Sequence, residues 1–325
     1  MTKPISNVFA SIGTVVLTFG GARAADALFL QVVRPPRGAV LLASDVILAT
    51  VFGVVVYLWL NLRATRTRLT AMERAQIVLD TQLSLAAKIQ RDLLPTVPIE
   101  SNGVRWAGRL EPAYGVAGDF YDFIPTAGDG LFVIGDVSGK GVPAALLQAS
   151  AHSLFRTLSR ETVHPADLLT RVSREIYAEN AGASYLTCLL LRIDSAAGTL
   201  MYANAGHPTG LITGKSGRQL LSRGGPPAGL FCETAYESEV VFLQPGDLGV
   251  LVTDGITEAI DEDSVSIDVL NRTICNVAEP RTPERVCEAL MEMARRGPGP
   301  RGVANWQDDR TVLVFQLDGQ GTLHS

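Results

Sequence analysis

The stretch “GDVSGKG”, residues 135–141, directly follows the apolar run “LFVI” and at first suggests a phosphate-binding loop. A P-loop needs the spacing GxxxxGK followed by Ser or Thr, so that backbone N–H groups surround the phosphates. Here only three residues separate Gly135 from Gly139, and Gly141 stands at the position of the hydroxyl. The spacing therefore argues against a P-loop. It leaves Asp136, a carboxylate at the end of an apolar run, as the residue whose role must be explained.

The chain has 325 residues and a formal net charge of −5. This length predicts one large folded domain and a smaller region. The charge gives no basic surface of the kind that binds nucleic acid, so nucleic acid is not an expected partner. The four cysteines form no CxxC pair and have no histidine at zinc-ligand spacing, which predicts reduced thiols. They are Cys188, Cys232, Cys275 and Cys287.

Two apolar segments lie in residues 1–63, which we predict to be a membrane region. Residues 38–62 are long enough to cross the hydrocarbon core and contain one charge, Asp45, so they predict a transmembrane helix. Residues 8–21 form a shorter run that precedes the small residues “ARA” at 22–24, and they are either a first transmembrane helix or a signal peptide. Arginines flank the second segment on both sides, and by a narrow margin they place the C-terminal part in the cytoplasm.

Residues 64–95 predict a helical linker, because the stretch up to Leu94 has no Gly or Pro and many strong helix formers. One series of residues recurs at alternating spacings of three and four, as in a coiled coil, with two glutamines interrupting it. The series is Leu69, Met72, Gln76, Leu79, Leu83, Ala86, Gln90 and Leu93. Two interpretations remain open: a helix that pairs in a homodimer, or an amphipathic helix that packs on its own domain. Pro95 and Pro98 end the helix.

Residues 96–318 predict a single α+β domain, followed by a tail at 319–325. Short apolar runs between turn residues indicate mostly antiparallel strands, among them “LFVIGDV” and “TVLVFQL”. Helical stretches are limited to residues 143–156, 165–180 and 283–296. Many strands and few helices favour an antiparallel β-sandwich flanked by α-helices over a doubly wound sheet.

Acidic residues recur where apolar runs begin or end, at Asp119, Asp136, Asp254 and the pair Asp308–Asp309. Asp beside Gly often marks nothing more than a turn between strands. If these strand ends converged, however, the carboxylates would raise one another's pKa values unless a cation joined them. Oxygen ligands without His or Cys favour Mg²⁺ or Mn²⁺, and two such ions can activate water against a phosphorus atom. Spacing alone leaves both interpretations open.

Six segments, in this order, resemble motifs of the PPM-type (PP2C-like) metal-dependent serine/threonine phosphatases, and more narrowly the bacterial branch that includes SpoIIE and RsbU. They are “AAKIQRDLLP” (86–95), “EPAYGVAGDFYDFI” (111–124), “FVIGDVSGKGVPAALL” (132–147), “YANAGHPTGLI” (202–212), “GVLVTDGITEA” (249–259) and “DDRTVLVF” (308–315). The resemblance covers roughly residues 86–317. It implies a helix-flanked β-sandwich that holds two Mn²⁺ or Mg²⁺ ions.

The resemblance also assigns the metal-binding and catalytic residues. Asp136 would bridge both ions, with the carbonyl of Val137 as a further ligand. Asp119 would serve the second ion, and Asp254 and Asp308 the first. Asp308 is favoured over Asp309, although the resemblance leaves that choice open.

Other motif residues carry weaker expectations. Gly118, Gly139 and Gly255 would let the backbone approach the ions closely, and Asp122 would act through a bound water. Ala117 stands where the family usually has a second glycine. Ser138 stands where eukaryotic relatives carry a histidine proposed as general acid, so the proton donor is unassigned.

Three cationic or titratable residues in the motifs have two interpretations each. His207 either holds a turn or takes part in catalysis. Lys140 and Arg310 either contact phosphate or are solvated cations, and for Lys140 the second interpretation is favoured.

The apolar segments and the resemblance together predict a membrane-tethered phosphatase of the bacterial inner membrane, with its catalytic domain in the cytoplasm. Its substrate would be phosphoserine or phosphothreonine on a regulatory protein, often an anti-anti-sigma factor of the STAS type. The helix at 64–94 would control activity. The alternative function is a catalytically silent scaffold that keeps the fold and binds a regulatory partner; the presence of all four expected carboxylates argues against it. A nucleotide cyclase would need a triphosphate or base pocket, for which the sequence has no motif.

Overall fold

The structure is a computed structural model that describes residues 37–95, 99–101, 103–126, 130–215, 217–259, 266–297 and 308–318. The first apolar run, at residues 8–21, lies outside the described residues. The chain divides into two compact units, Met1–Val78 and Leu79–Ser325, which are described separately below.

Helix α2 (Arg37–Leu93) is one helix of 57 residues, and it contains both the predicted transmembrane segment and the predicted linker. The sequence shows why no break occurs between them: this range contains two glycines, Gly38 and Gly53, and no proline. In the part of the chain that the structure describes, one helix is long and apolar enough to cross a membrane, over Asp45–Leu93.

In the unit Leu79–Ser325, the end of α2 packs on its own domain. The side chains of the predicted coiled-coil series become less exposed toward the end of the helix. Leu69, Met72 and Leu79 are exposed, whereas Leu83, Ala86, Gln90 and Leu93 are half-buried. From Leu83 onward the second of the two interpretations, packing on the same chain, is therefore confirmed. Pairing with a second copy stays a prediction.

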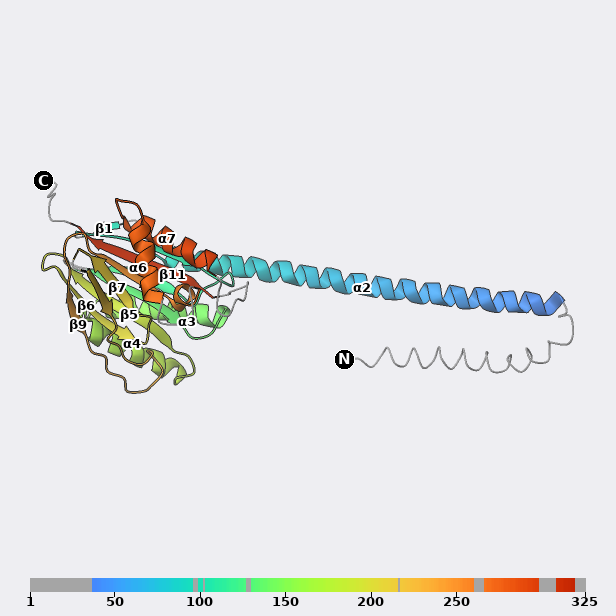
Figure 1. The fold of residues 1–325 in the computed structure, drawn as a ribbon. Coiled ribbons are helices and arrows are strands. Elements are labelled where there is room, and N and C mark those ends of the chain that lie inside the picture. Colours follow the sequence, from blue (N-terminus) through green and yellow to red (C-terminus); the bar gives the residue numbers. More distant parts are fainter. Residues whose placement is uncertain are drawn as a thin grey trace. The chain divides into compact units, whose positions relative to one another are not determined.

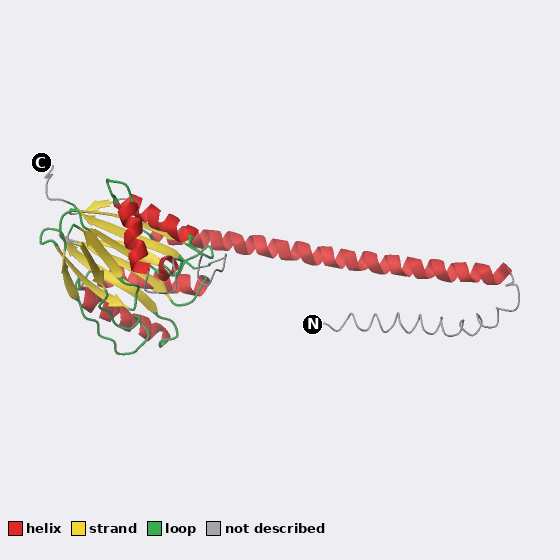
Figure 2. Cartoon of the chain, viewed as in Figure 1, coloured by secondary structure: helices red, strands yellow, loops and turns green. Residues whose placement is uncertain are grey.

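Two antiparallel sheets form the core of the domain (Figures 1 and 2), which confirms the predicted β-sandwich. In spatial order the first sheet contains β1 (Ile99–Ser101), β2 (Val104–Glu111), β11 (Arg310–Leu317), β10 (Leu248–Val252), β7 (Gly210–Gly214) and β8 (Gly217–Leu221). The second contains β3 (Phe120–Pro125), β4 (Gly130–Val137), β5 (Leu186–Asp194), β6 (Thr199–Ala205) and β9 (Glu239–Phe242).

Helices cover the outer face of each sheet. Helices α3 (Val142–Leu158) and α4 (Pro165–Asn180) pack on the second sheet, and α6 (Ser266–Asn276) and α7 (Pro283–Arg296) belong to the cluster on the first (Figure 1). The three predicted helical stretches are thus confirmed as α3, α4 and α7. The short helix α5 (Asp254–Thr257) and helix α6 were not predicted.

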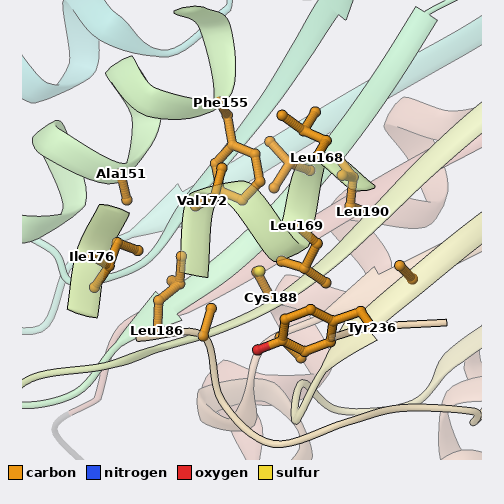
Figure 3. Close-up of a cluster of buried hydrophobic side chains, with 14 of the residues drawn as sticks. Ala151, Phe155, Leu168, Leu169, Val172, Ile176, Leu186, Cys188, Leu190 and Tyr236 are labelled. Atoms are coloured by element: carbon orange, nitrogen blue, oxygen red, sulfur yellow. The ribbon is translucent and has the colours of Figure 1, made fainter. Parts of the chain in front are cut away.

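Each central strand is apolar on both faces because both faces are covered. On β4, Phe132 and Ile134 enter the core between the sheets, whereas Leu131 and Val133 face α3 and α4. This alternation follows from the two-residue period of a strand. Figure 3 shows the helix-covered face, where Phe155 and the side chains of α4 lie over Leu186, Cys188 and Leu190. The strand ends, and the acidic residues on them, are thereby held on a rigid frame.

Candidate metal centre

Carboxylates from both sheets lie at one end of the sandwich. Asp136 is the penultimate residue of β4, and Asp119 directly precedes β3. Strands β3 and β4 are neighbours, and Phe120 pairs with Gly135. In the first sheet, Asp254 follows β10 and the pair Asp308–Asp309 precedes β11. Thr253 and Thr311, beside the carboxylates of the first sheet, both donate to Asp119 of the second, and Lys140, four residues after Asp136, pairs with Asp308, so the two groups lie close together. The convergence that spacing left open therefore occurs.

The site is strongly acidic. Burial and then the negative charges of Asp254 and Asp308 raise the pKa of Asp136 to about 7. Burial and the charge of Asp136 raise the pKa of Asp119 well above its ordinary value. The pKa of Asp254 is also raised, by burial and then by Asp308. Such a group of carboxylates either retains protons or requires a cation.

Two threonine hydroxyls fix the orientation of Asp119, whose side chain is buried. Its Oδ2 atom accepts a hydrogen bond of 2.7 Å from Thr253 and one of 2.6 Å from Thr311. These bonds favour the ionised carboxylate and lower its pKa, against the effect of burial. Sequence analysis missed both threonines. The available signal was their position, because each lies within three residues of a predicted ligand, in “VTDG” and “DDRT”.

Asp308 and Asp309 have different surroundings. Both oxygens of Asp309 accept hydrogen bonds from backbone N–H groups, 2.8 Å from Ala113 and 2.7 Å from Gly118. Asp309 thus anchors the loop between β2 and β3. Asp308 instead pairs through Oδ2 with the ammonium group of Lys140 at 2.7 Å. Asp308 is therefore the member of the pair whose carboxylate already faces a cation.

We predicted that three glycines let the backbone pack closely around the site, and this is confirmed for two of them, Gly118 and Gly255. A Cβ atom on Gly118 would lie 3.1 Å from the carbonyl oxygen of Val137 and 3.4 Å from Oδ1 of Asp136. A Cβ atom on Gly255 would collide with the carbonyl of Asp309. Gly139 is different, because a Cβ there would meet no atom within 4 Å. Its φ of +99° is the reason for glycine, since L-residues rarely adopt that conformation.

Asp122 does not belong to the centre, contrary to its weaker sequence assignment. It lies on β3 with no exposed surface and pairs with Arg156 of α3 at 2.7 Å. Nε2 of His152, also on α3, lies 3.0 Å from the same carboxylate. Asp122 lies three positions after Asp119, so the two side chains point to opposite faces of the sheet. The side chain of Asp122 is therefore directed at the covering helix α3 and not at the other carboxylates.

His207 has a structural position. Its backbone N–H donates to Asn204, whose side-chain amide donates back to the carbonyl of His207. Its ring lies 3.1 Å from the hydroxyl of Thr187, and burial lowers its pKa to about 3. The ring is therefore neutral near pH 7 and holds the turn after β6, which supports the structural interpretation.

Two further motif residues have partners. Lys140 pairs with Asp308 while its side chain stays 54% exposed, so both of its interpretations remain predictions. Ser138 is tied to the start of β5: its N–H donates to the carbonyl of Tyr185, and its hydroxyl accepts from the N–H of Tyr185, both at 2.9 Å.

The residues present fit a hard divalent cation by their chemistry. All the candidate donors are oxygens, and the raised pKa values of Asp136 and Asp254 indicate that positive charge would stabilise their carboxylates. As they stand, no three Asp, Glu, His or Cys side chains among the described residues could hold an ion together. Asp308 is turned to Lys140, and Oδ2 of Asp119 accepts hydrogen bonds from the two threonines.

Comparison with known proteins yields one family and one fold. A family model described as stage II sporulation protein E (SpoIIE) matches residues 126–318. Phosphoserine phosphatase RsbP of Bacillus subtilis (strain 168) is 31% identical over 185 residues, covering 54% of this chain and 45% of that protein. Phosphoserine phosphatase RsbU of the same organism is 26% identical over 185 residues, covering 56% and 55%. The chain spans about half the length of these relatives.

A solved structure, the SiaA-PP2C domain of Pseudomonas aeruginosa, is similar with a TM-score of 0.64 and 23% identity. The match covers 75% of this chain and 99% of that domain. The domain built on the two sheets therefore has the PP2C fold.

Proposed function

Because this chain belongs to the SpoIIE family of PP2C-type phosphatases, we propose that it hydrolyses phosphoserine or phosphothreonine on a regulatory protein. The observation that carries the proposal is the meeting of Asp119, Asp136, Asp254 and Asp308 at one end of the sandwich. Burial and neighbouring carboxylates raise the pKa values of Asp119, Asp136 and Asp254, a cost that a purely structural set of turns would not need. The phosphoserine phosphatase activity named for two relatives supports the same reaction.

In the proposed centre, two Mn²⁺ or Mg²⁺ ions are held by Asp136 and the carbonyl of Val137, by Asp119, and by Asp254 with Asp308. When bound, such ions act as Lewis acids toward phosphoryl oxygens and make water a better nucleophile at neutral pH. Asp309 has the separate role of holding the loop that carries Asp119, because both its oxygens are engaged with that loop.

Lys140 has two proposed roles in this centre. It pairs with Asp308, so an ion held by Asp308 would compete with it for that carboxylate. Its side chain is about half exposed (54%), so it lies where a protein-bound phosphate could enter. A freed ammonium group there would attract the phosphate and stabilise its negative charge. His207 takes no part in proton transfer, since its ring is buried and neutral.

The proposed substrate is a cytoplasmic regulatory protein of the STAS type, an anti-anti-sigma factor, as the family resemblance implies. The proposed location is the bacterial inner membrane, with residues 38–62 of α2 across the bilayer. Trp59 and Arg63 support an interface near position 60: the guanidinium carbon lies 5.2 Å from the centre of the indole ring. Aromatic and basic residues of this kind are enriched where a transmembrane helix leaves the bilayer.

The test is phosphate release by the full-length protein in detergent micelles, with a phosphoserine peptide and with p-nitrophenyl phosphate. We expect release with Mn²⁺ or Mg²⁺, none with chelator, and none from Asp136→Asn or Asp254→Asn. Asp268→Asn, the same change at an exposed position of helix α6, is the matched control and should retain activity. A folded wild-type protein that binds Mn²⁺ but releases no phosphate would refute the enzyme and favour the silent scaffold.

A further inference from the structure

Residues 206–209 carry the chain from the second sheet to the first, at the end where the carboxylates lie. Strand β6 of the second sheet ends at Ala205, and β7 of the first sheet begins at Gly210. Strand β7 pairs with β10, which is followed directly by Thr253 and Asp254. His207 is a buried residue of this connection. It therefore lies near strand ends of both sheets.

The backbone of His207 is held on both sides by the side chain of Asn204. The N–H of His207 donates to Oδ1 at 2.7 Å, and Nδ2 donates to the carbonyl of His207 at 3.0 Å. Gly206 makes the bend before it with a φ of +70°, and a Cβ atom there would lie 3.2 Å from Pro227. The direction of the imidazole ring is therefore set by a fixed backbone.

Thr187 of β5 is the cross-strand partner of Asp136 on β4. Its neighbours Leu186 and Cys188 face the covering helices (Figure 3), so Thr187 faces the space between the sheets. Side chains of directly opposite residues in an antiparallel pair project from the same face. The side chains of Asp136 and Thr187 therefore lie side by side and point toward the first sheet.

The hydroxyl of Thr187 has two polar neighbours. Nδ1 of His207 lies 3.1 Å from it, and the carbonyl oxygen of Asp136 lies 3.5 Å from it, at the outer limit of a hydrogen bond. A hydroxyl has one proton to donate, and a carbonyl can only accept. Both contacts are therefore made together only when Nδ1 of His207 carries the ring proton and donates to Thr187.

The other nitrogen of the His207 ring favours the same tautomer. Burial lowers the pKa of the ring to about 3, so near neutral pH it carries one proton. The backbone of Val252 favours the protonated ring, yet Nε2 makes no hydrogen bond of ordinary geometry with a described residue. A proton on Nε2 would thus be a buried donor without an acceptor, and the hydroxyl of Thr187 would turn from Asp136 to Nδ1.

We propose that His207 is a positioning residue for the metal centre. Its ring, protonated at Nδ1, donates to the hydroxyl of Thr187, which donates to the carbonyl of Asp136. That carbonyl belongs to the peptide unit that joins Asp136 to Val137, the two proposed ligands at the end of β4. The ring thereby helps to set the direction of both ligands. The metal role of Asp136 rests on the proposed function, whereas the chain of hydrogen bonds does not.

The first measurement is the tautomer of His207 in metal-free, full-length protein in detergent micelles near neutral pH. Nitrogen-15 NMR distinguishes a proton on Nδ1 from a proton on Nε2. The chain has four histidines, so the signal that is lost in His207→Asn identifies the ring. We expect the proton on Nδ1. A wild-type ring with its proton on Nε2 would overturn the inference.

The second measurement is calorimetric titration of matched variants with Mn²⁺. Thr187→Val keeps the shape of the side chain and removes the hydroxyl, and His207→Leu removes both ring nitrogens. Each should weaken Mn²⁺ binding about tenfold, as expected for loss of a group that orients a ligand. The double variant should bind no more weakly than either single variant, because both changes break the same chain of hydrogen bonds.

Conservative variants separate this role from a general effect on stability. His207→Asn keeps an N–H donor near the position of Nδ1, and Thr187→Ser keeps the hydroxyl. Both should bind Mn²⁺ within about threefold of the wild type, since the loss from a broken chain would be about tenfold. Thr199→Val is the control and should bind like the wild type, because Thr199 lies at the opposite end of the neighbouring strand β6.

Wild-type Mn²⁺ affinity in Thr187→Val would overturn the inference, and so would losses in the two single variants that add in the double variant. If His207→Leu fails to fold, the affinity of Thr187→Val decides. A wild-type protein that binds no Mn²⁺ would refute the proposed function and, with it, the metal role of His207. The tautomer needs neither metal nor turnover, so it would still decide whether the ring holds Asp136 through Thr187.

Discussion

The hydroxyl of Thr311 donates a 2.6 Å hydrogen bond to Oδ2 of Asp119, across 192 positions of the sequence and from one sheet to the other. Together with the hydroxyl of Thr253, it stabilises the ionised form of the most deeply buried carboxylate of the centre. The side chain is thereby held through Oδ2. This contact links the two sheets at the point where the proposed ions bind.

Thr311→Val should weaken both the fold and the centre, because valine keeps the shape and removes the hydroxyl. We expect a loss of about 1 to 3 kcal/mol in unfolding free energy, the cost of a buried acceptor left without its donor. Mn²⁺ affinity should fall about tenfold, since the ligand is no longer oriented. Thermal unfolding and Mn²⁺ titration measure these effects. Thr213→Val, the same change on β7, is the control, and equal effects from the two variants would contradict the account.

Asp308 and Asp309 should respond differently to the same substitution. Asp308→Asn should abolish phosphate release while unfolding stays close to wild type, since it removes a proposed ligand that is partly exposed. Asp309→Asn should instead loosen the loop at 113–118, because an amide cannot accept from two N–H groups with both of its ends. Phosphate release and hydrogen exchange distinguish them. Full activity in Asp308→Asn with none in Asp309→Asn would reverse the assignment.

Lys140→Met should tighten Mn²⁺ binding and weaken substrate binding. The ammonium group competes with the ion for Asp308, and an exposed pair of this kind is worth little, so affinity for Mn²⁺ should rise by no more than about fivefold. The KM for the phosphopeptide should rise because a cation near the phosphate is lost. Lys215→Met, at the turn after β7, controls for surface charge. Weaker Mn²⁺ binding in Lys140→Met would show that the lysine does not compete for the carboxylate.

Removal of metal should reverse the pH dependence of stability. In the metal-free protein the pKa of Asp136 is raised from 3.8 to about 7, so the folded chain binds more protons than the unfolded chain between these values. Its contribution to stability is therefore greatest below about pH 4 and is lost as the pH rises to about 7. Mn²⁺ needs the ionised carboxylate, so its stabilising effect grows over the same range.

The measurement is thermal unfolding from about pH 5 to about pH 8, with chelator and with Mn²⁺. Asp136→Asn should flatten the decline of the chelated protein. The raised pKa of Asp136 would be contradicted if the chelated wild-type protein became more stable as the pH rises over this range and Asp136→Asn showed the same pH dependence.

The sequence was sufficient for the fold class because burial on both faces of a strand leaves a clear apolar run, as in β4 and β11. Helices α4 and α7 were predicted from their helix formers, and each begins at a proline. Strands β2 and β3 were harder to recognise. Arg105, Gly108 and Arg109 interrupt β2, and β3 contains Asp122, whose charge is neutralised by Arg156 of a distant helix. A one-dimensional pattern does not show such a partner.

The sequence predicted the carboxylates of the candidate site but not the side chains that hydrogen-bond to them or to their loops. Carboxylates beside glycine at strand ends form a recognisable motif once several occur in order. Thr253, Thr311 and Gln90 act through contacts with residues far away in the sequence, and threonine or glutamine at such positions has no distinctive spacing. The same limit applies to Asp122, which the family resemblance placed near the ions and which instead pairs with Arg156 of α3.

The most direct test of the account is the number of Mn²⁺ ions that the full-length protein binds at equilibrium, with and without Asp136. We predict two ions for the wild type and loss of high-affinity binding of both in Asp136→Asn, because that carboxylate is the proposed bridge. Asp268→Asn should bind two ions like the wild type. A wild-type protein that binds no Mn²⁺, or Asp136→Asn binding two ions with unchanged affinity, would contradict the proposed centre.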